Sequence, residues 1–208
     1  MKISYGITVC NELKEIQILF NFLLENKRKE DEIVILFDKK NGTNEVWSYL
    51  KLISGKDCSV HSEEFDNDFS NWKNILSDFC NGDYIFQIDA DEVPHKYLIL
   101  NLPLIIESNP NNDLFLVPRI NTVEGLTKEH VSRWNWSVNS LGWVNYPDYQ
   151  TRIWKKIDSI GWVGQVHERL RGYNNYSALP DVEEYSLYHP KDIERQEKQN
   201  NFYSNLIR

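Results

Sequence analysis

The sequence predicts an α/β fold with a mostly parallel central sheet and helices on both faces. The first observation is that, between residues 3 and 94, apolar runs alternate with segments in which apolar residues recur every three or four positions. The second is that the apolar runs are nearly continuous, as expected of strands covered on both faces. Strands that alternate with helices in this way are typical of parallel sheets.

The elements of the first half follow in order along the chain. A strand at 3–10 leads into a helix at 11–26, for which Asn11 is the candidate N-cap. The apolar stripe of this helix includes Ile16 and Phe20 and is expected to pack on the sheet. The predicted elements that follow are a strand at 32–37, a helix carrying Val46, Trp47, Leu50 and Ile53, a short strand at 58–62, a helix at 69–82 and a strand that starts at Tyr84.

After about residue 110 the pattern changes. Residues 113–120 are predicted as one more strand, and residues 121–150 are rich in Trp, Tyr, Asn and Ser without a helical period. This segment is predicted as loops and short strands over one end of the sheet. The remaining predictions are strands at 150–156 and 166–172 and an exposed helix from Asp192 to Arg208, whose Tyr203, Leu206 and Ile207 are expected to close the core.

The composition indicates one globular domain. The chain has 208 residues, and its 31 acidic against 23 basic residues give a formal charge of −8, so nucleic acid is not an expected partner. The longest apolar stretch, at 97–106, is broken by Asn101 and Pro103 and is too short to span a bilayer. The N-terminus lacks a signal-peptide pattern, and three widely spaced cysteines are typical of reduced core residues. A cytoplasmic protein is therefore expected.

Three carboxylates follow the buried strand "YIFQI" within four positions, at Asp89, Asp91 and Glu92. Crowded carboxylates at a strand end need a cation or a row of hydrogen-bond donors, unless they are simply solvated loop acids. The pattern favours Mg²⁺ or Mn²⁺ shared with substrate phosphates. Because ligands bind at the carboxyl ends of parallel strands, Asp38 and this cluster are expected to face one crevice.

Five blocks of the chain together resemble family 2 of the glycosyltransferases. They are "TVCNE", "ILFD", "DFSNWKNILSDFCNGDYIFQIDADE", "YPDYQTRIWKK" and "VHERL", in the family's order, and the resemblance runs from about residue 3 to residue 203. The chain is similar to bacterial glucosyltransferase-like proteins that extend lipopolysaccharide cores. The resemblance implies a GT-A fold with a Rossmann-like sheet.

The resemblance also implies a reaction and a division of the chain. The reaction is metal-dependent, inverting transfer of a sugar from a nucleotide diphosphate sugar, with a UDP-sugar expected, to an acceptor hydroxyl on a glycan. The cofactor is Mn²⁺ or Mg²⁺. Residues 1–208 form a single domain, in which 1–110 bind the nucleotide sugar and the loop-rich residues 111–208 bind the acceptor. The residues leave the identity of the sugar, the acceptor and the oligomeric state open.

The family's donor-site residues map onto strand ends and one helix of this chain. Lys39 and Lys40 depart from the family pattern after the second strand, which weakens the expected base contact there. By resemblance, the donor-site residues are Thr8 and Glu12 beside the nucleoside, Asp38 on the base, Lys73 and Asn74 near the diphosphate or ribose, Asp89 near the ribose and the metal, and Asp91 as direct metal ligand.

The second half supplies the expected base and further candidates. Glu168 matches the acid that takes the acceptor proton, its alternative being a surface ion pair with a neighbouring arginine. His189 is a candidate metal ligand or a structural histidine. Arg152 is predicted to balance the diphosphate or to tie the two halves together. The tryptophans of residues 134–143 either stack on an acceptor sugar or pack under a loop.

Two other functions remain open at this point. A nucleotidyltransferase that makes a nucleotide sugar would share the fold, but it is expected to carry a Gly-rich basic loop after the first strand, where this chain has "CNELKE". A non-catalytic carbohydrate-binding protein could use the Trp-rich segment, but it has no use for Asp89, Asp91 and Lys73.

Overall fold

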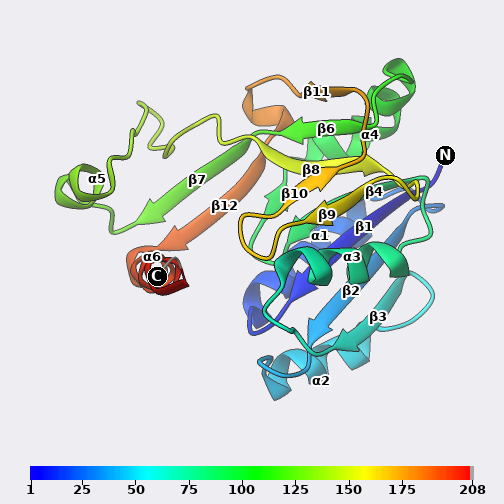
Figure 1. The fold of residues 1–208 in the computed structure, drawn as a ribbon, viewed down its shortest axis with the longest axis horizontal. Helices are drawn as coiled ribbons and strands as arrows, with labels where there is room; N and C mark the ends of the chain where they lie inside the picture. The colour runs from blue at the N-terminus through cyan, green and yellow to red at the C-terminus, as the bar shows by residue number, and fades with distance from the viewer. Residues whose placement is uncertain (207–208) are drawn as a thin grey trace.

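The computed structural model describes residues 1–206, with the exception of the side chains of 199 and 201–206. Within this part of the chain, a seven-stranded sheet has the order β11-β6-β8-β4-β1-β2-β3 (Figure 1). Its strands are β1 (Ile3–Val9), β2 (Glu32–Asp38), β3 (Cys58–Glu63), β4 (Tyr84–Asp89), β6 (Leu114–Val117), β8 (Gln150–Lys155) and β11 (Tyr176–Ala178).

The central sheet is mostly parallel, as predicted. β1 pairs in parallel with both β2 and β4, β2 with β3, and β6 with β11, whereas β8 is antiparallel to its neighbours β4 and β6. Thr8 of β1 lies opposite Leu36 of β2 and Asp89 of β4 in the register. The carboxyl ends of the three central strands therefore meet at one edge of the sheet.

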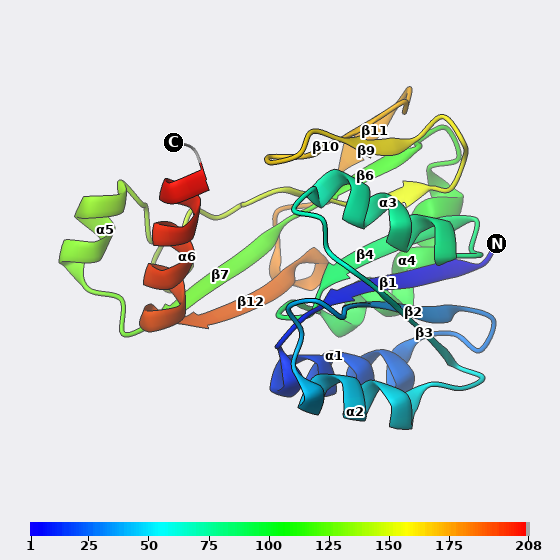
Figure 2. The same cartoon turned by 60° about the horizontal axis from the view of Figure 1, so that its bottom comes forward.

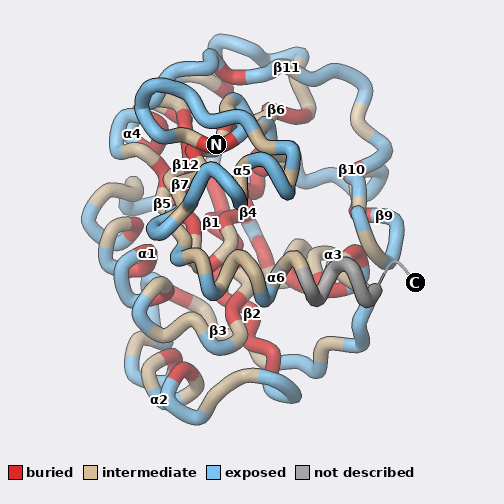
Figure 3. The backbone as a smooth tube through the Cα atoms, turned by 90° about the vertical axis from the view of Figure 1, so that its left-hand side faces the viewer, coloured by how far each residue is buried: buried red, intermediate tan, exposed pale blue. Residues whose placement is uncertain are grey.

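Helices cover both faces of this sheet, as predicted (Figure 2). One face is packed by α1 (Leu13–Asn26), α2 (Asn44–Ile53) and α4 (Lys96–Ser108). The other is packed by α3 (Phe69–Phe79) and by the antiparallel pair β9 (Gly161–Val163) and β10 (Arg169–Arg171). Figure 3 shows that buried residues are concentrated along the central strands.

The stripe on α1 packs into the core as the periodicity predicts. Ile16, Leu19 and Leu23 are fully buried, and each such burial contributes about 1.5–3 kcal/mol. The expected N-cap was wrong, because the helix begins at Leu13 with Glu12 as its N-cap residue.

Residues of the second half also build a smaller sheet beside the first. It has the order β5-β12-β7, formed by β5 (Val93–Pro94), β12 (Leu187–Asp192) and β7 (Arg119–Glu124). β7 and β12 extend away from the central sheet and end near α5 (Lys128–Trp134) and α6 (Ile193–Leu206), as Figure 1 shows. A 3-10 turn, η1 (Glu183–Tyr185), precedes β12. The predicted single strand at 113–120 is two strands in different sheets, because Pro118 has no N–H for a ladder bond.

Two helices were not expected from the sequence. α4 carries Pro103 in its interior and exposes Leu100 and Leu104, so its apolar residues follow no single stripe. α5 buries none of its residues and so has no apolar period, but Thr127 caps it by accepting a hydrogen bond from the His130 N–H.

The C-terminal helix was predicted from Asp192 and begins at Ile193. The expected closure of the core by Tyr203, Leu206 and Ile207 falls outside the described side chains. No helix among residues 1–206 combines the length and the apolar character needed to cross a bilayer.

Candidate active site

The carboxyl ends of β1, β2 and β4 bring several predicted donor-site residues to one edge of the sheet. Thr8 and Asp89 are register partners on adjacent strands, and Asp38 ends the next strand. Along β4, side chains alternate between faces, so Asp89 lies on the face covered by α3 and not on the face covered by α1. This edge is where parallel sheets bind their ligands.

Asp38 is committed to the turn that follows β2. Its Oδ1 accepts hydrogen bonds from the Lys40, Asn41 and Phe65 N–H groups at 2.9, 3.2 and 3.3 Å, and its Oδ2 accepts one from the Asn41 side chain at 2.7 Å. The carboxylate is 5% exposed. In this arrangement Asp38 shapes the loop between the strand end and α2.

Glu12 is likewise committed to the backbone. Its Oε2 accepts hydrogen bonds from the N–H groups of Cys10 at 2.8 Å and Asn11 at 3.0 Å. The glutamate thus folds back over the end of β1, which explains why Asn11 is not the cap. Its Oε1 lies 3.8 Å from Arg195 Nη2.

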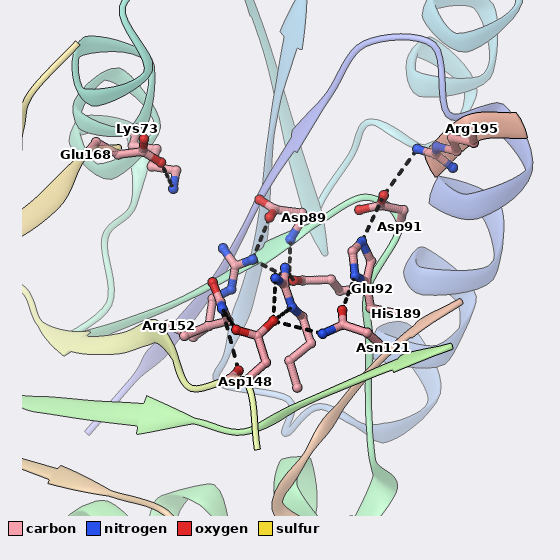
Figure 4. Close-up of polar contacts among 12 residues, drawn as sticks. Lys73, Asp89, Asp91, Glu92, Asn121, Asp148, Arg152, Glu168, His189 and Arg195 are labelled. Carbon is pink, nitrogen blue, oxygen red and sulfur yellow. Dashed lines mark hydrogen bonds and ion pairs between the residues drawn. The ribbon is translucent and has the colours of Figure 1, made fainter. Parts of the chain in front are cut away.

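Arg152 connects Asp89 to a buried network. Its Nη2 lies 2.5 Å from Asp89 Oδ2 and 2.6 Å from Glu92 Oε1, and the guanidinium is 3% exposed (Figure 4). Glu92 is fully buried, and its Oε2 accepts the Asp89 N–H at 3.1 Å. Of the two expectations for Arg152, this position matches the tie between the two halves of the chain.

The network extends to the second sheet. Arg119 Nη1 lies 3.0 Å from Glu92 Oε1, and its Nη2 lies 2.7 Å from Asp148 Oδ2. Burial raises the pKa of Asp89, but the charges of Arg152 and then of Lys73 outweigh it and hold the pKa well below its usual range. Asp89 is therefore an anion at neutral pH.

A chain of side chains orients His189 toward Asp91. Asn121 donates from its Nδ2 to Asp148 at 2.8 Å, which turns its Oδ1 toward His189 Nδ1 at 2.7 Å. Since a carbonyl oxygen only accepts, Nδ1 must carry a proton. A neutral His189 then presents the lone pair of Nε2 to Asp91 Oδ2 at 3.3 Å.

Two acceptors that face each other at this distance need a cation or a proton between them. A carboxylate and an imidazole whose other nitrogen is held by a hydrogen bond are a suitable ligand pair for Mn²⁺. Among residues 1–206, no three His, Cys, Asp or Glu side chains are grouped tightly enough to hold a metal alone. Mg²⁺ and Mn²⁺ sites commonly combine one or two carboxylates with substrate phosphates, so the Asp91 and His189 pair fits such an ion.

Arg195, near the start of α6, supplies positive charge to Asp91. Its Nη2 lies 3.2 Å from Asp91 Oδ2, and its Nη1 lies 2.9 Å from Glu15 Oε1 on α1. Burial raises the pKa of Asp91, but contact with His189 in its doubly protonated form outweighs burial and holds that pKa below its usual range. A cavity of about 450 Å³ borders Arg195 and is also lined by Glu15, Lys191 and Gly142.

Glu168 pairs with Lys73 instead of a neighbouring arginine. Lys73 Nζ lies 2.5 Å from Glu168 Oε1, and the two side chains are 14% and 17% exposed. The ammonium also lies 4.2 Å from the centre of the Trp162 ring. Lys73 of α3, which was predicted for the donor site, thus contacts Glu168, which lies just before β10 and was predicted for the acceptor site.

Asn74 holds α3 against β9. Its Nδ2 donates to the Trp162 carbonyl at 2.9 Å, and its Oδ1 accepts the Trp162 N–H at 2.8 Å. Both polar groups of the side chain are therefore used within the protein. This position differs from the expected contact with the diphosphate or ribose, because β9, the strand that receives these bonds, was not predicted.

Unpartnered polar atoms lie around the same site. Within the described side chains, the buried nitrogen and oxygen atoms that have no hydrogen-bond partner belong to Gln87, Arg152 and Trp162. By strand alternation, Gln87 and Arg152 point to the same face as Asp89. They offer donors beneath the edge where a polar ligand would lie.

The aromatic side chains of residues 134–146 contact each other beyond this site. Trp134 stacks on His130 with ring centres 5.1 Å apart and lies 4.6 Å from Trp136, while Trp143 lies 4.7 Å from Tyr146. The three tryptophans are partly exposed. Glu92 was predicted only as a member of the carboxylate cluster. Roles for Arg119, Asn121, Asp148 and Arg195 were not predicted, because their sequence signal is no more than a charge or an amide.

Comparisons with known proteins identify the family and the fold. The model of the family described as "Glycosyl transferase family 2" matches residues 4–170. No sequence among the curated proteins matches the chain. The fold is similar to that of S. aureus TarS 1-349, with a TM-score of 0.65 and 18% identity over 91% of this chain and 60% of that one. The same fragment in complex with UDP-GlcNAc gives a TM-score of 0.64 and 18% identity over 92% of this chain and 59% of that one.

The chain thus spans about three fifths of the TarS fragment that it matches. The family model covers most of the chain, from the first strand through Glu168, and the structural similarity shows the GT-A fold. The chain belongs to glycosyl transferase family 2 and has the GT-A fold.

Proposed function

We propose that the protein transfers a sugar from a UDP-sugar to an acceptor hydroxyl, with inversion at the anomeric carbon and with the help of Mn²⁺ or Mg²⁺. The observation that carries this proposal is the Asp91 and His189 pair, which faces a common point at the carboxyl edge of the sheet. The choice of UDP is supported by S. aureus TarS, whose structures are described as complexes with UDP-GlcNAc and UDP.

The donor lies along the edge formed by β1, β2 and β4. Thr8 and Asp89 flank the ribose, and the loops shaped by Glu12 and Asp38 enclose the nucleoside. Arg152 acts from below by fixing Asp89, since its guanidinium is buried between two carboxylates. Residues 1–110 supply most of this donor site.

Asp91 and His189 would hold the metal ion, with Asp89 two residues before Asp91 in the chain. When bound, Mn²⁺ or Mg²⁺ neutralises negative charge on the diphosphate leaving group. The chain of hydrogen bonds from Asp148 through Asn121 keeps the Nε2 lone pair of His189 directed at the ion's position.

Glu168 acts as the general base. It takes the proton of the acceptor hydroxyl while that oxygen forms a bond to the anomeric carbon. The bond between the anomeric carbon and the diphosphate oxygen breaks at the same time, and the diphosphate leaves with the bonding electron pair. Attack from the face opposite the diphosphate inverts the configuration.

The acceptor is a glycan that approaches from residues 111–208. The partly exposed rings of Trp134, Trp136 and Trp143 offer flat apolar surface to the C–H faces of sugars. Glu168 belongs to the same half of the chain, so acceptor and base come from one side.

A transfer assay with a panel of UDP-sugars and oligosaccharide acceptors tests the proposal. Release of UDP that requires both the acceptor and Mn²⁺, together with an inverted product anomer by NMR, is the expected result. Two other outcomes would replace the proposal. Pyrophosphate release from UTP and a sugar phosphate indicates a nucleotidyltransferase. Glycan binding without turnover of any nucleotide sugar indicates a binding protein.

A further inference from the structure

An ion pair with Lys73 holds Glu168, the proposed general base. The 2.5 Å contact occupies Glu168 Oε1, and both side chains are largely shielded from solvent (Figure 4). An ammonium group bound to a carboxylate oxygen lowers the basicity of that oxygen toward a hydroxyl proton. Release of Lys73 would therefore make Glu168 a stronger base.

The surroundings of Lys73 allow such a change. A lysine carries its charge on a flexible four-carbon stem, and the face of Trp162, 4.2 Å away, offers the ammonium a second attractive contact. Lys73 belongs to α3, which packs on the face of the sheet where Asp89 and the proposed donor edge lie.

The framework around the pair is held by other bonds. Asn74 is bound to the Trp162 backbone through both of its polar groups. The Phe69 N–H donates to the Gln165 carbonyl at 3.1 Å, which ties the start of α3 to the loop before Glu168. Movement of the lysine side chain alone can therefore release Glu168 while α3 and the loop stay in place.

We propose that Lys73 is a positioning residue that exchanges partners during the reaction. It pairs with Glu168 before the donor binds, and it moves to the diphosphate once the donor is present. The exchange frees Glu168 for the acceptor hydroxyl only when a donor is in place. This inference rests on the proposed transferase function and adds to it an order of events.

A double-mutant cycle on nucleotide binding tests the exchange. Calorimetry with UDP and Mn²⁺ is carried out on the unmodified protein, Glu168→Gln, Lys73→Met and the double variant. Because Glu168 competes with the diphosphate for Lys73, Glu168→Gln is expected to bind UDP about threefold to tenfold more tightly. Lys73→Met is expected to bind UDP more weakly, and Glu168→Gln added to it is expected to change nothing.

A matched control separates competition from a general loss of negative charge. Asp158→Asn, in the exposed turn before β9, makes the same charge change without touching Lys73, and it is expected to leave UDP affinity unchanged. Tighter binding by Glu168→Gln that persists in the Lys73→Met background would overturn the exchange, as would unchanged or weaker binding.

The failure of the exchange and that of the proposed function are distinguishable. UDP binding by the unmodified protein without a gain in Glu168→Gln removes the exchange and leaves the transferase proposal intact. If the unmodified protein binds none of UDP, GDP, CDP and dTDP, with or without Mn²⁺, both proposals are overturned.

Discussion

Arg195 Nη2 lies 3.2 Å from Asp91 Oδ2, the same oxygen that faces His189 Nε2 at 3.3 Å. A guanidinium from α6 therefore supplies positive charge at the point where Asp91 and His189 are proposed to bind a metal ion (Figure 4). The ion and the guanidinium both attract this carboxylate oxygen, so they are expected to compete for it.

Removal of this guanidinium is predicted to strengthen metal binding. Arg195→Ala is expected to raise the affinity for Mn²⁺ about threefold to tenfold, the range of a partly exposed ion pair, as measured by electron paramagnetic resonance titration. Arg133→Ala serves as the control, because it removes an arginine that pairs with Glu197 and is 57% exposed. An unchanged or lower Mn²⁺ affinity in Arg195→Ala would show that the guanidinium does not compete.

The loss of Arg195 also frees Glu15, which the guanidinium binds at 2.9 Å. The double variant Arg195→Ala/Glu15→Gln distinguishes an effect through Asp91 from an effect through Glu15. If the gain in Mn²⁺ affinity comes from Asp91, the double variant keeps it.

Neutralising the base is predicted to stop the chemical step. Glu168→Gln keeps the shape of the side chain but cannot take a proton, so kcat is expected to fall about 10²- to 10⁴-fold. The measurement is transfer at saturating donor and acceptor. Asp158→Asn is expected to keep the unmodified rate. A near-normal kcat in Glu168→Gln would assign the proton to another group.

Arg152 is predicted to stabilise the fold in a manner that depends on pH. Arg152→Met leaves Asp89 and Glu92 without their shared cation, and the loss is expected to be about 3–5 kcal/mol at pH 7. In the unmodified protein the pKa of Asp89 is depressed, so its contribution is present above the unfolded value of about 3.9 and is lost as the pH falls through the folded value.

In the variant, burial without the arginine favours the protonated carboxyl. The difference in unfolding free energy between the two proteins is therefore expected to shrink from pH 7 to about pH 4, as measured by urea denaturation. Arg171→Met, on the exposed side of β10, is the control. A difference that is constant with pH would mean that the carboxylates are not stabilised by Arg152.

Asn74 is predicted to stabilise the folded protein and not to bind the ligand. Asn74→Ala removes two hydrogen bonds to the Trp162 backbone and is expected to cost about 1–3 kcal/mol in unfolding free energy. Asn71→Ala, on the same helix with an exposed bond to Asp66, is expected to cost less. A variant of normal stability that no longer binds UDP would instead place Asn74 on the ligand.

The sequence was informative where a local pattern determines the structure. β1, β2 and β4 were predicted because buried parallel strands need continuous apolar runs, and the acids after β4 were predicted to lie at the ligand edge for the same reason. α5 was not predicted, because a helix that buries no residue leaves no apolar period.

The partners of the site could not be predicted, because they come from distant segments. Glu92 looks like a third solvated acid in the sequence, and its burial follows only from the positions of Arg119 and Arg152. The contact of Arg195 with Asp91 depends on how α6 lies over α1, and charge alone does not specify that arrangement.

The most direct test of the account is calorimetric titration of UDP into the unmodified protein and Asp91→Asn, each with Mn²⁺ and then with EDTA. Asp91 is proposed to bind the ion together with His189, and its side chain lies beside those of His189 and Arg195. The unmodified protein is expected to bind UDP at least about tenfold more tightly with Mn²⁺ than with EDTA, and Asp91→Asn is expected to lose this difference. Equal UDP affinity in both proteins and under both conditions would contradict a metal site at Asp91.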